Sequence, residues 1–118
     1  MARRIVFASL VVSALAAATL LVPLASGAPA AKYTVTAIDF KFRNMPKTAA
    51  PGTHNFTLVN KGGEEHDLKL AGKKTKILKT GQRASITVAL KRGQTYAFLC
   101  TVPGHAALGM KGKVVTKG

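Results

Sequence analysis

After its first thirty residues, the chain alternates polar and apolar positions over most of its length. This period of two is typical of strands that bury one face. Between residues 33 and 42 the alternation changes phase halfway, which predicts a strand with a bulge in its middle. We expect further strands over residues 53–59, 85–90 and 95–101, and a last short strand around residues 114–115.

The segment 66–70 places a histidine among apolar positions. His66, Leu68 and Leu70 fall in one phase, and the two residues between them fall in the other. Because alternate residues of a strand face the same side, His66 is expected to point inward with the leucines. Residues 72–82 carry four lysines, which predicts a solvated edge strand or a loop.

These elements define the fold class. No stretch of residues 31–118 has a convincing helical period, and the chain contains no internal repeat. Glycine and proline residues separate the apolar runs at short intervals. A chain of 118 residues fits one small domain. Seven to eight short strands joined by such turns predict an all-β fold, either an antiparallel sandwich or a barrel.

The first thirty residues have a different pattern. Two arginines precede an uncharged apolar run from Ile5 to Ala25, and small residues follow it, as in an export signal. We predict that residues 1–30 are cleaved after Ala30 and that residues 31–118 form the mature domain. The protein is then periplasmic or extracellular. The alternative is an uncleaved leader that tethers the protein to the membrane, because the run approaches the roughly 18–20 residues that span a bilayer.

The chain is strongly basic because acidic residues are scarce. It has 18 Lys and Arg against 4 Asp and Glu, a formal charge of +14. Residues 1–30 hold two of the basic residues and no acidic one, so the mature domain carries +12. Such a charge steers a protein toward partners with acidic surfaces or toward anionic membrane surfaces, and salt weakens the attraction. Nucleic acid is not an expected partner of an exported protein, and we expect a monomer.

Three potential metal ligands lie at the end of the predicted strand 95–101 and on the loop that leaves it. Cys100, His105 and Met110 stand at equal intervals, and their thiolate, imidazole and thioether groups suit copper better than zinc, magnesium or calcium. His66 could add a second imidazole if the sandwich brings it to the same end. Together the four residues would form a mononuclear type 1 (blue) copper site for electron transfer. The single cysteine excludes an intramolecular disulfide and a zinc site with several thiolates.

Each of these residues also has a simpler interpretation. A lone cysteine or methionine is usually part of an apolar core, and an inward histidine is usually hydrogen-bonded. The combination in one exported all-β chain favours the copper site. His54 is also in phase with apolar positions but needs no ligand role, and Met45, beside a proline, is interpreted as packing.

Several motifs make the chain resemble the cupredoxins, a family of small blue copper proteins. The motifs are IDFKF, PGTHNFTLVNKG, EEHDL, YAFLC and VPGHAALGMKGKV, and the resemblance covers residues 33–115. It implies a Greek-key β-sandwich and single-electron transfer between larger redox proteins. The family pattern places the copper ligands on His66, Cys100, His105 and Met110.

The resemblance also concerns two features beside the site, namely the residue after the first histidine and the surface around His105. The residue after the first ligand histidine is often asparagine in this family, whereas here it is Asp67. A carboxylate can accept hydrogen bonds from backbone N–H groups or from a hydroxyl such as that of Thr101, but it cannot donate one. In the family, one imidazole edge reaches the surface through an apolar patch. The residues that flank His105 in this way are Pro103, Ala106, Ala107 and Leu108.

Three functions remain open at this point. The first is an exported carrier of single electrons with one copper ion. The second is an extracytoplasmic copper-binding or delivery protein with the same fold, and the third is a structural β-sandwich module. An enzyme is not expected, because the chain lacks a recognisable nucleophile motif and three histidines are too few for a multicopper oxidase.

Overall fold

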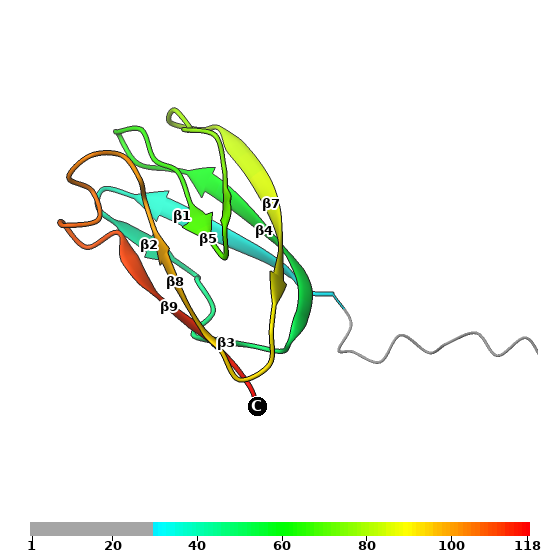
Figure 1. Cartoon of the computed structure of the whole chain (residues 1–118). Helices are drawn as coiled ribbons and strands as arrows, with labels where there is room; N and C mark the ends of the chain where they lie inside the picture. Colours follow the sequence, from blue (N-terminus) through cyan, green and yellow to red (C-terminus); the bar gives the residue numbers. More distant parts are fainter. Residues whose placement is uncertain (1–29) are drawn as a thin grey trace, which may run out of the picture.

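The computed structural model describes residues 30–118, which form a sandwich of two β-sheets (Figure 1). The predicted signal segment, residues 1–30, lies outside the described residues except for Ala30. One sheet contains β1 (Lys32–Ile38), β2 (Lys41–Arg43), β4 (Gly52–Asn60) and β7 (Arg83–Leu90). The other contains β3 (Thr48–Ala49), β5 (Lys69–Leu70), β6 (Lys73–Lys74), β8 (Thr95–Leu99) and β9 (Lys111–Thr116).

The order of strands confirms the all-β sandwich and corrects one detail of it. The sheets run β2-β1-β4-β7 and β3-β9-β8-β5-β6. Most neighbours are antiparallel, but β1 pairs with β4 and β3 pairs with β9 in parallel. The expectation of a purely antiparallel arrangement is therefore wrong for these two pairs. After β2 the chain crosses to the second sheet as β3 and then returns, so that β4 runs in the direction of β1.

The predicted bulge within residues 33–42 is instead a reversal of the chain. β1 ends at Ile38, residues 39–40 form a turn, and β2 pairs back along β1 with Ile38 opposite Lys41. A bulge and a two-residue turn both shift an alternating pattern by one position, so periodicity alone does not distinguish them. The difference matters because this turn contributes side chains to the site described below.

The inward positions of both sheets form one hydrophobic core, as the alternation predicted. Tyr33 on β1 stacks on Phe56 of the adjacent β4, with ring centroids 4.9 Å apart. Phe98 of β8 contacts Phe42 of β2 edge-on across the sandwich, at 5.7 Å between centroids. The alternate residues of β7 and β9 complete the core, namely Ile86, Val88, Leu90 and Val114.

The segment from residue 66 to residue 82 follows its predicted course. His66 is buried and forms an isolated bridge with Leu78, so that it points inward as expected. Leu68 and Leu70 are buried on the same side. The basic stretch contains the short strand β6, which lies at the edge of the five-stranded sheet with both lysines exposed.

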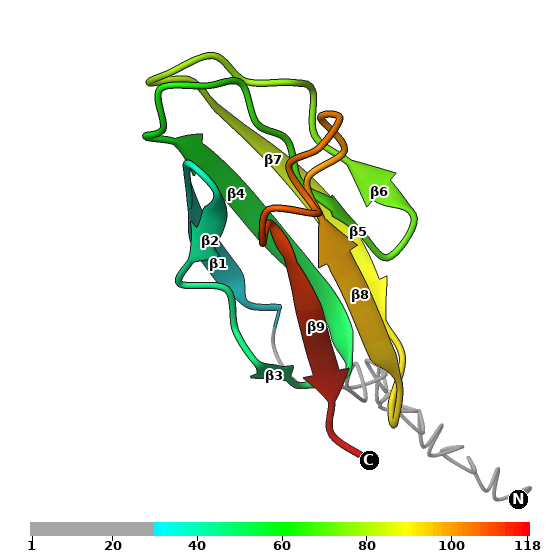
Figure 2. The same ribbon diagram turned by 90° about the vertical axis from the view of Figure 1, so that its left-hand side faces the viewer.

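One end of the sandwich carries the loop that contains Cys100, His105 and Met110. Residues 100–110 connect β8 to β9 as the orange loop in Figure 2, and the β7–β8 connection lies at the opposite end of the sandwich. The described residues include no helix long and apolar enough to cross a bilayer.

Candidate metal centre

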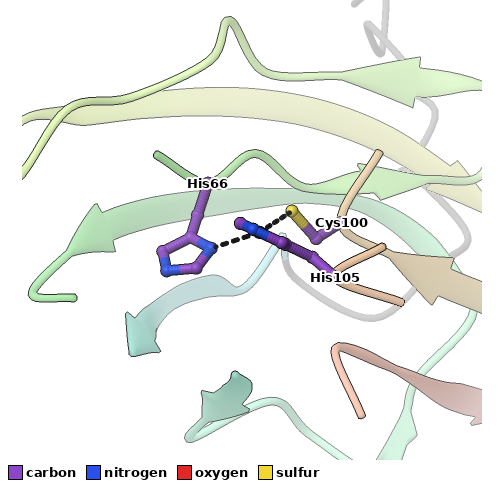
Figure 3. Close-up of side chains that lie close together, drawn as sticks. All are labelled: His66, Cys100 and His105. Atoms are coloured by element: carbon purple, nitrogen blue, oxygen red, sulfur yellow. Dashed lines mark hydrogen bonds between the residues drawn. The ribbon is translucent and has the colours of Figure 1, made fainter. Parts of the chain in front are cut away.

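Three of the four residues predicted as ligands meet at this end of the sandwich. The Nδ1 atoms of His66 and His105 are 3.2 Å apart, and the Cys100 sulfur is 3.7 Å from His105 Nδ1 (Figure 3). One potential ligand atom from each residue lies within 4.8 Å of the other two. All three side chains are buried, with exposures of 0% for His66, 1% for Cys100 and 7% for His105.

The β8–β9 loop folds back on itself to place two of these residues. Cys100 continues the inward phase of β8 just beyond its end. The backbone N–H of His105 donates to the Val102 carbonyl at 3.1 Å, closing a turn. Gly104 in this turn has φ of +84°, a region that glycine enters without steric cost. The loop therefore returns the imidazole of His105 to the thiol of Cys100.

Met110 closes the same loop from its far end. Its N–H donates to the His105 carbonyl at 3.1 Å, and its carbonyl accepts from the Cys100 N–H at 3.0 Å. Its side chain is fully buried. The structure thus places the backbone of Met110 against both Cys100 and His105, as a fourth ligand would require. Its role as an axial ligand stays a prediction.

His66 comes from a separate loop that Asn60 holds in place. The Asn60 side chain donates to the carbonyls of Glu64 and Leu78, both at 2.8 Å, and accepts from the Gly62 N–H at 2.8 Å. The backbone of His66 exchanges hydrogen bonds with Leu78. Asn60 is fully buried, so these bonds satisfy a polar side chain that would otherwise be costly to bury.

A carboxylate lies behind each imidazole. Asp39, in the β1–β2 turn, accepts from His66 Nε2 at 2.7 Å, and the Glu64 carboxylate lies 2.9 Å from His105 Nε2. The hydrogen bond from His66 lowers the pKa of Asp39; partial burial opposes the shift, and the backbone N–H groups of Glu64 and Gly63 add to it. Sequence reasoning did not identify Asp39 or Glu64 as site residues.

The ring of Phe40 was also missed. It contacts His105 edge-on at 5.0 Å and His66 at 6.3 Å, measured between ring centroids. Phe40 and Asp39 reach the site because the chain reverses at residues 39–40 instead of continuing as one strand. The phase change after Ala37 is the signal of this reversal in the sequence, and the same change is compatible with the predicted bulge.

Asp67 joins the two loops that carry the candidate ligands. Its side chain is buried and accepts from the Thr101 backbone N–H at 2.6 Å and from the Thr101 hydroxyl. This confirms the expectation that a carboxylate here acts only as an acceptor. The segment next to His66 is thereby tied to the residue that follows Cys100.

The donor set fits a metal ion. His66 donates its Nε2–H to Asp39, so its Nδ1 keeps a lone pair that faces His105 Nδ1. A metal ion between the two Nδ1 atoms would take the place of the proton that joins them at 3.2 Å. Burial raises the pKa of the Cys100 thiol, so a bound cation is also needed to favour its thiolate. Two imidazoles and a thiolate are a ligand set that copper favours.

His54 and Met45, for which the sequence predicted no ligand role, have other contacts. His54 is buried, its Nδ1 accepts from the Ala31 N–H at 3.0 Å, and its Nε2 contacts the Ala50 carbonyl at 2.6 Å. Backbone groups therefore engage both ring nitrogens. Met45 packs against the hydrophobic core, as predicted.

A β-sandwich with two imidazoles and a thiol buried together at one end has the features of the cupredoxin class of copper proteins. Comparison with known families supports this directly. Residues 30–117 match the family described as copper binding proteins, plastocyanin/azurin family. The chain belongs to this family, and its cofactor is copper.

Individual relatives share shorter segments. Azurin from Pseudomonas aeruginosa is 46% identical over 46 residues, which cover 36% of this chain and 30% of that azurin. Azurin from Pseudomonas denitrificans has the same identity over 46 residues and is covered to 35%. The matched segment therefore spans about a third of the length of these relatives.

Solved structures share the fold over most of the chain. Auracyanin from Roseiflexus castenholzii has a TM-score of 0.67 at 21% identity, covering 78% of this chain and 100% of that one. An azurin (Az-iso2) from Methylomonas sp. strain J has a TM-score of 0.64 at 18% identity, covering 77% and 100%. These similarities support the cupredoxin fold.

Proposed function

We propose that the protein is an exported small blue copper protein that carries single electrons between redox partners. One copper ion would be held by His66 Nδ1, Cys100 Sγ, His105 Nδ1 and the thioether of Met110. The observation that carries the proposal is the buried convergence of two imidazoles and one thiol within 4.8 Å. Copper supplies a centre that alternates between Cu(II) and Cu(I), and no substrate bond is made or broken.

The scaffold keeps the ligands in one arrangement during such a cycle. Cys100, His105 and Met110 are linked by backbone hydrogen bonds within one loop, and His66 is fixed by the buried bridge to Leu78. Asp67 connects the two parts through Thr101. A site whose ligands move little between the two oxidation states has a small barrier to electron transfer.

The surface beside His105 suits brief contacts with a partner. Pro103, Ala107 and Leu108 are exposed around it, with Leu108 exposed to 62%, and Ala106 is half-buried. His105 itself lies just beneath this patch. Apart from the Glu64 carboxylate beside His105 the patch is apolar, and a small apolar contact favours a complex that forms and dissociates quickly.

A row of lysines next to the site suits an acidic partner. The sheet register makes direct neighbours of four residues on β6, β5, β8 and β9, namely Lys74, Lys69, Leu99 and Lys111. Lys113 lies opposite Ala97, two positions further along β9. All four lysines are exposed on the outer face of this sheet. Leu99 directly precedes Cys100, so a partner bound there would lie close to the centre.

The visible spectrum of the copper-loaded mature protein tests the ligand assignment. We expect an intense blue colour that Cys100→Ser abolishes while the fold is retained. Met110→Leu should keep the colour but raise the reduction potential, because a weak thioether donor to Cu(II) is lost. Met45→Leu makes the same substitution at a methionine outside the cluster and is the matched control. A Cys100→Ser variant that stays blue would contradict the proposal.

Electrochemistry separates electron transfer from the other functions. A carrier should give a fast, reversible one-electron voltammetric response. A slow or irreversible response with tight copper binding would favour delivery, and failure to take up one equivalent of copper would favour a structural module. The mass of the protein recovered after export tests the leader, since cleavage after Ala30 leaves Ala31 as the first residue.

A further inference from the structure

The few acidic residues of this basic chain are concentrated at one place. The sequence has 4 Asp and Glu against 18 Lys and Arg. Asp39 and Glu64 contact the candidate imidazoles, and Asp67 holds the loop after Cys100. Only Glu65 makes no such contact within the described residues. Three of the four acidic side chains thus lie at or beside the copper site, which calls for a specific role.

Asp39 is held on His66 by more than the imidazole itself. Its Oδ1 accepts from His66 Nε2 at 2.7 Å and from the Glu64 N–H at 3.2 Å, and its Oδ2 accepts from the Gly63 N–H at 3.0 Å. The carboxylate is therefore oriented before any metal binds. Its side chain is 32% exposed, whereas the imidazole is fully buried.

The loop leaves room for this pair through Gly62. A Cβ atom on Gly62 would lie 2.4 Å from Asp39 Oδ1 and 2.7 Å from His66 Nε2. Any side chain at this position would push the carboxylate and the imidazole apart. The space beside Gly62, the two backbone N–H donors and the imidazole together hold the Asp39 carboxylate in one position.

Glu64 places a second carboxylate beside His105 at the surface. Its Oε2 lies 2.9 Å from His105 Nε2, and its side chain is 55% exposed. Glu64 and Asp39 are linked, because the Glu64 backbone N–H is one of the donors to Asp39. A single loop, residues 61–65, thus presents one carboxylate and orients the other.

We propose that Asp39 and Glu64 are positioning residues that tune the copper centre, one behind each ligand imidazole. Asp39 accepts from the Nε2–H of His66, which keeps Nδ1 free for the metal and makes it a stronger donor, and the Glu64 carboxylate lies 2.9 Å from His105 Nε2. Negative charge beside the ligands stabilises Cu(II) more than Cu(I), so the pair lowers the reduction potential against the field of a strongly cationic protein. The inference rests on the ligand assignment proposed above.

Three single substitutions separate this role from general electrostatics. Asp39→Asn removes a carboxylate charge but keeps an oxygen that can accept from His66 Nε2, and Glu64→Gln removes the charge beside His105 Nε2. Glu65→Gln removes the same charge from the residue next to Glu64 without a contact to either imidazole. The measured quantities are the Cu(II) affinity and the reduction potential of each copper-loaded protein at one neutral pH.

We expect Asp39→Asn to bind Cu(II) about tenfold more weakly, the lower end of what such neighbours contribute. With Cu(I) binding unchanged, tenfold corresponds to a rise of about 59 mV for a one-electron couple. Glu64→Gln should change the potential in the same direction and Glu65→Gln much less. Equal shifts in all three variants, or none, would overturn the inference while leaving a blue wild-type protein consistent with the proposed function.

The apo-protein provides a readout that does not depend on copper. Nitrogen-15 chemical shifts of the imidazoles report which nitrogen carries the proton. We expect the Nε2–H form for His66 in the wild type and a loss of that preference in Gly62→Ala. If His66 keeps the Nε2–H form in Gly62→Ala, the carboxylate does not orient the ring. A wild-type protein that takes up no copper would instead contradict the proposed function.

Discussion

At the scale of single residues, Asp67 is the most demanding group to bury. It is a fully buried carboxylate, and its hydrogen bonds come from the backbone N–H and the hydroxyl of Thr101. Hydrogen bonds to a charged group contribute more than neutral ones, and removing the acceptor leaves two partly buried donors without a partner. This one side chain therefore stabilises the junction between the two loops that carry the candidate ligands.

Asp67→Ala should lower the free energy of unfolding of the apo-protein by about 2 kcal/mol, measured by urea denaturation. Asp67→Asn should cost less, because an amide oxygen still accepts from the Thr101 N–H and the amide N–H can donate to the hydroxyl. Thr101→Val, which removes only the hydroxyl, serves as the intermediate case. An Asp67→Ala protein within about 0.5 kcal/mol of the wild type would show that the junction does not depend on this contact.

The residues of the site differ in how well the sequence predicted their positions. His66 and Cys100 could be placed inward because strand alternation fixes the direction of a side chain, and their donor types indicated copper. Thr101 could be proposed as a partner of Asp67 because the chemistry of a carboxylate restricts its contacts. Asp39 and Phe40 could not be found in this way, since their position depends on where the chain reverses, and Glu64 extends from a loop without periodicity.

At the scale of the elements, the contact between β8 and β9 depends on one glycine. Gly112 pairs with Phe98, and a Cβ atom on Gly112 would lie 2.4 Å from the Phe98 ring. The ring uses this space to reach Phe42 on β2 in the other sheet. Gly112 thus permits the five-stranded sheet to pack against the hairpin that carries Asp39 to the metal centre.

Gly112→Ala should destabilise the protein by about 1–3 kcal/mol, because a methyl group added to a packed core forces neighbours to move. If the clash with Phe98 is the cause, the same substitution should cost less than half as much in a Phe98→Leu background. Urea denaturation of the two single variants and the double variant measures this coupling. An equal cost of Gly112→Ala in both backgrounds would rule out the ring as the source.

The strands also show which features of the fold a period of two cannot predict. Alternation located the strands of the core because burial on one face imposes a period of two, whether the neighbour is parallel or antiparallel. For the same reason it could not reveal that β4 runs parallel to β1. Residues 33–42 form two strands, β1 and β2, where one was expected, and the two-residue strand β3 is too short to carry a pattern. These two differences account for nine strands in residues 30–118 where seven to eight were expected.

At the scale of the whole molecule, charge is distributed unevenly in a way that the sequence only partly predicted. Its composition indicated a cationic surface. The sheet register adds that Lys69, Lys74, Lys111 and Lys113 share the outer face next to Cys100. Lys91 and Arg92 lie instead in the β7–β8 connection at the opposite end of the sandwich (Figure 1). These two groups allow position to be tested separately from net charge.

Small inorganic oxidants of opposite charge provide that test. We expect oxidation of the reduced protein by the anion hexacyanoferrate(III) to slow as salt is added, and oxidation by the cation tris(phenanthroline)cobalt(III) to become faster. Lys69→Gln with Lys111→Gln should lower the rate with the anion at low salt by about tenfold, at the lower end of electrostatic steering effects. Lys91→Gln with Arg92→Gln removes the same charge and should have a much smaller effect. Equal losses in the two double variants would mean that overall charge, and not the lysine row beside the site, guides the encounter.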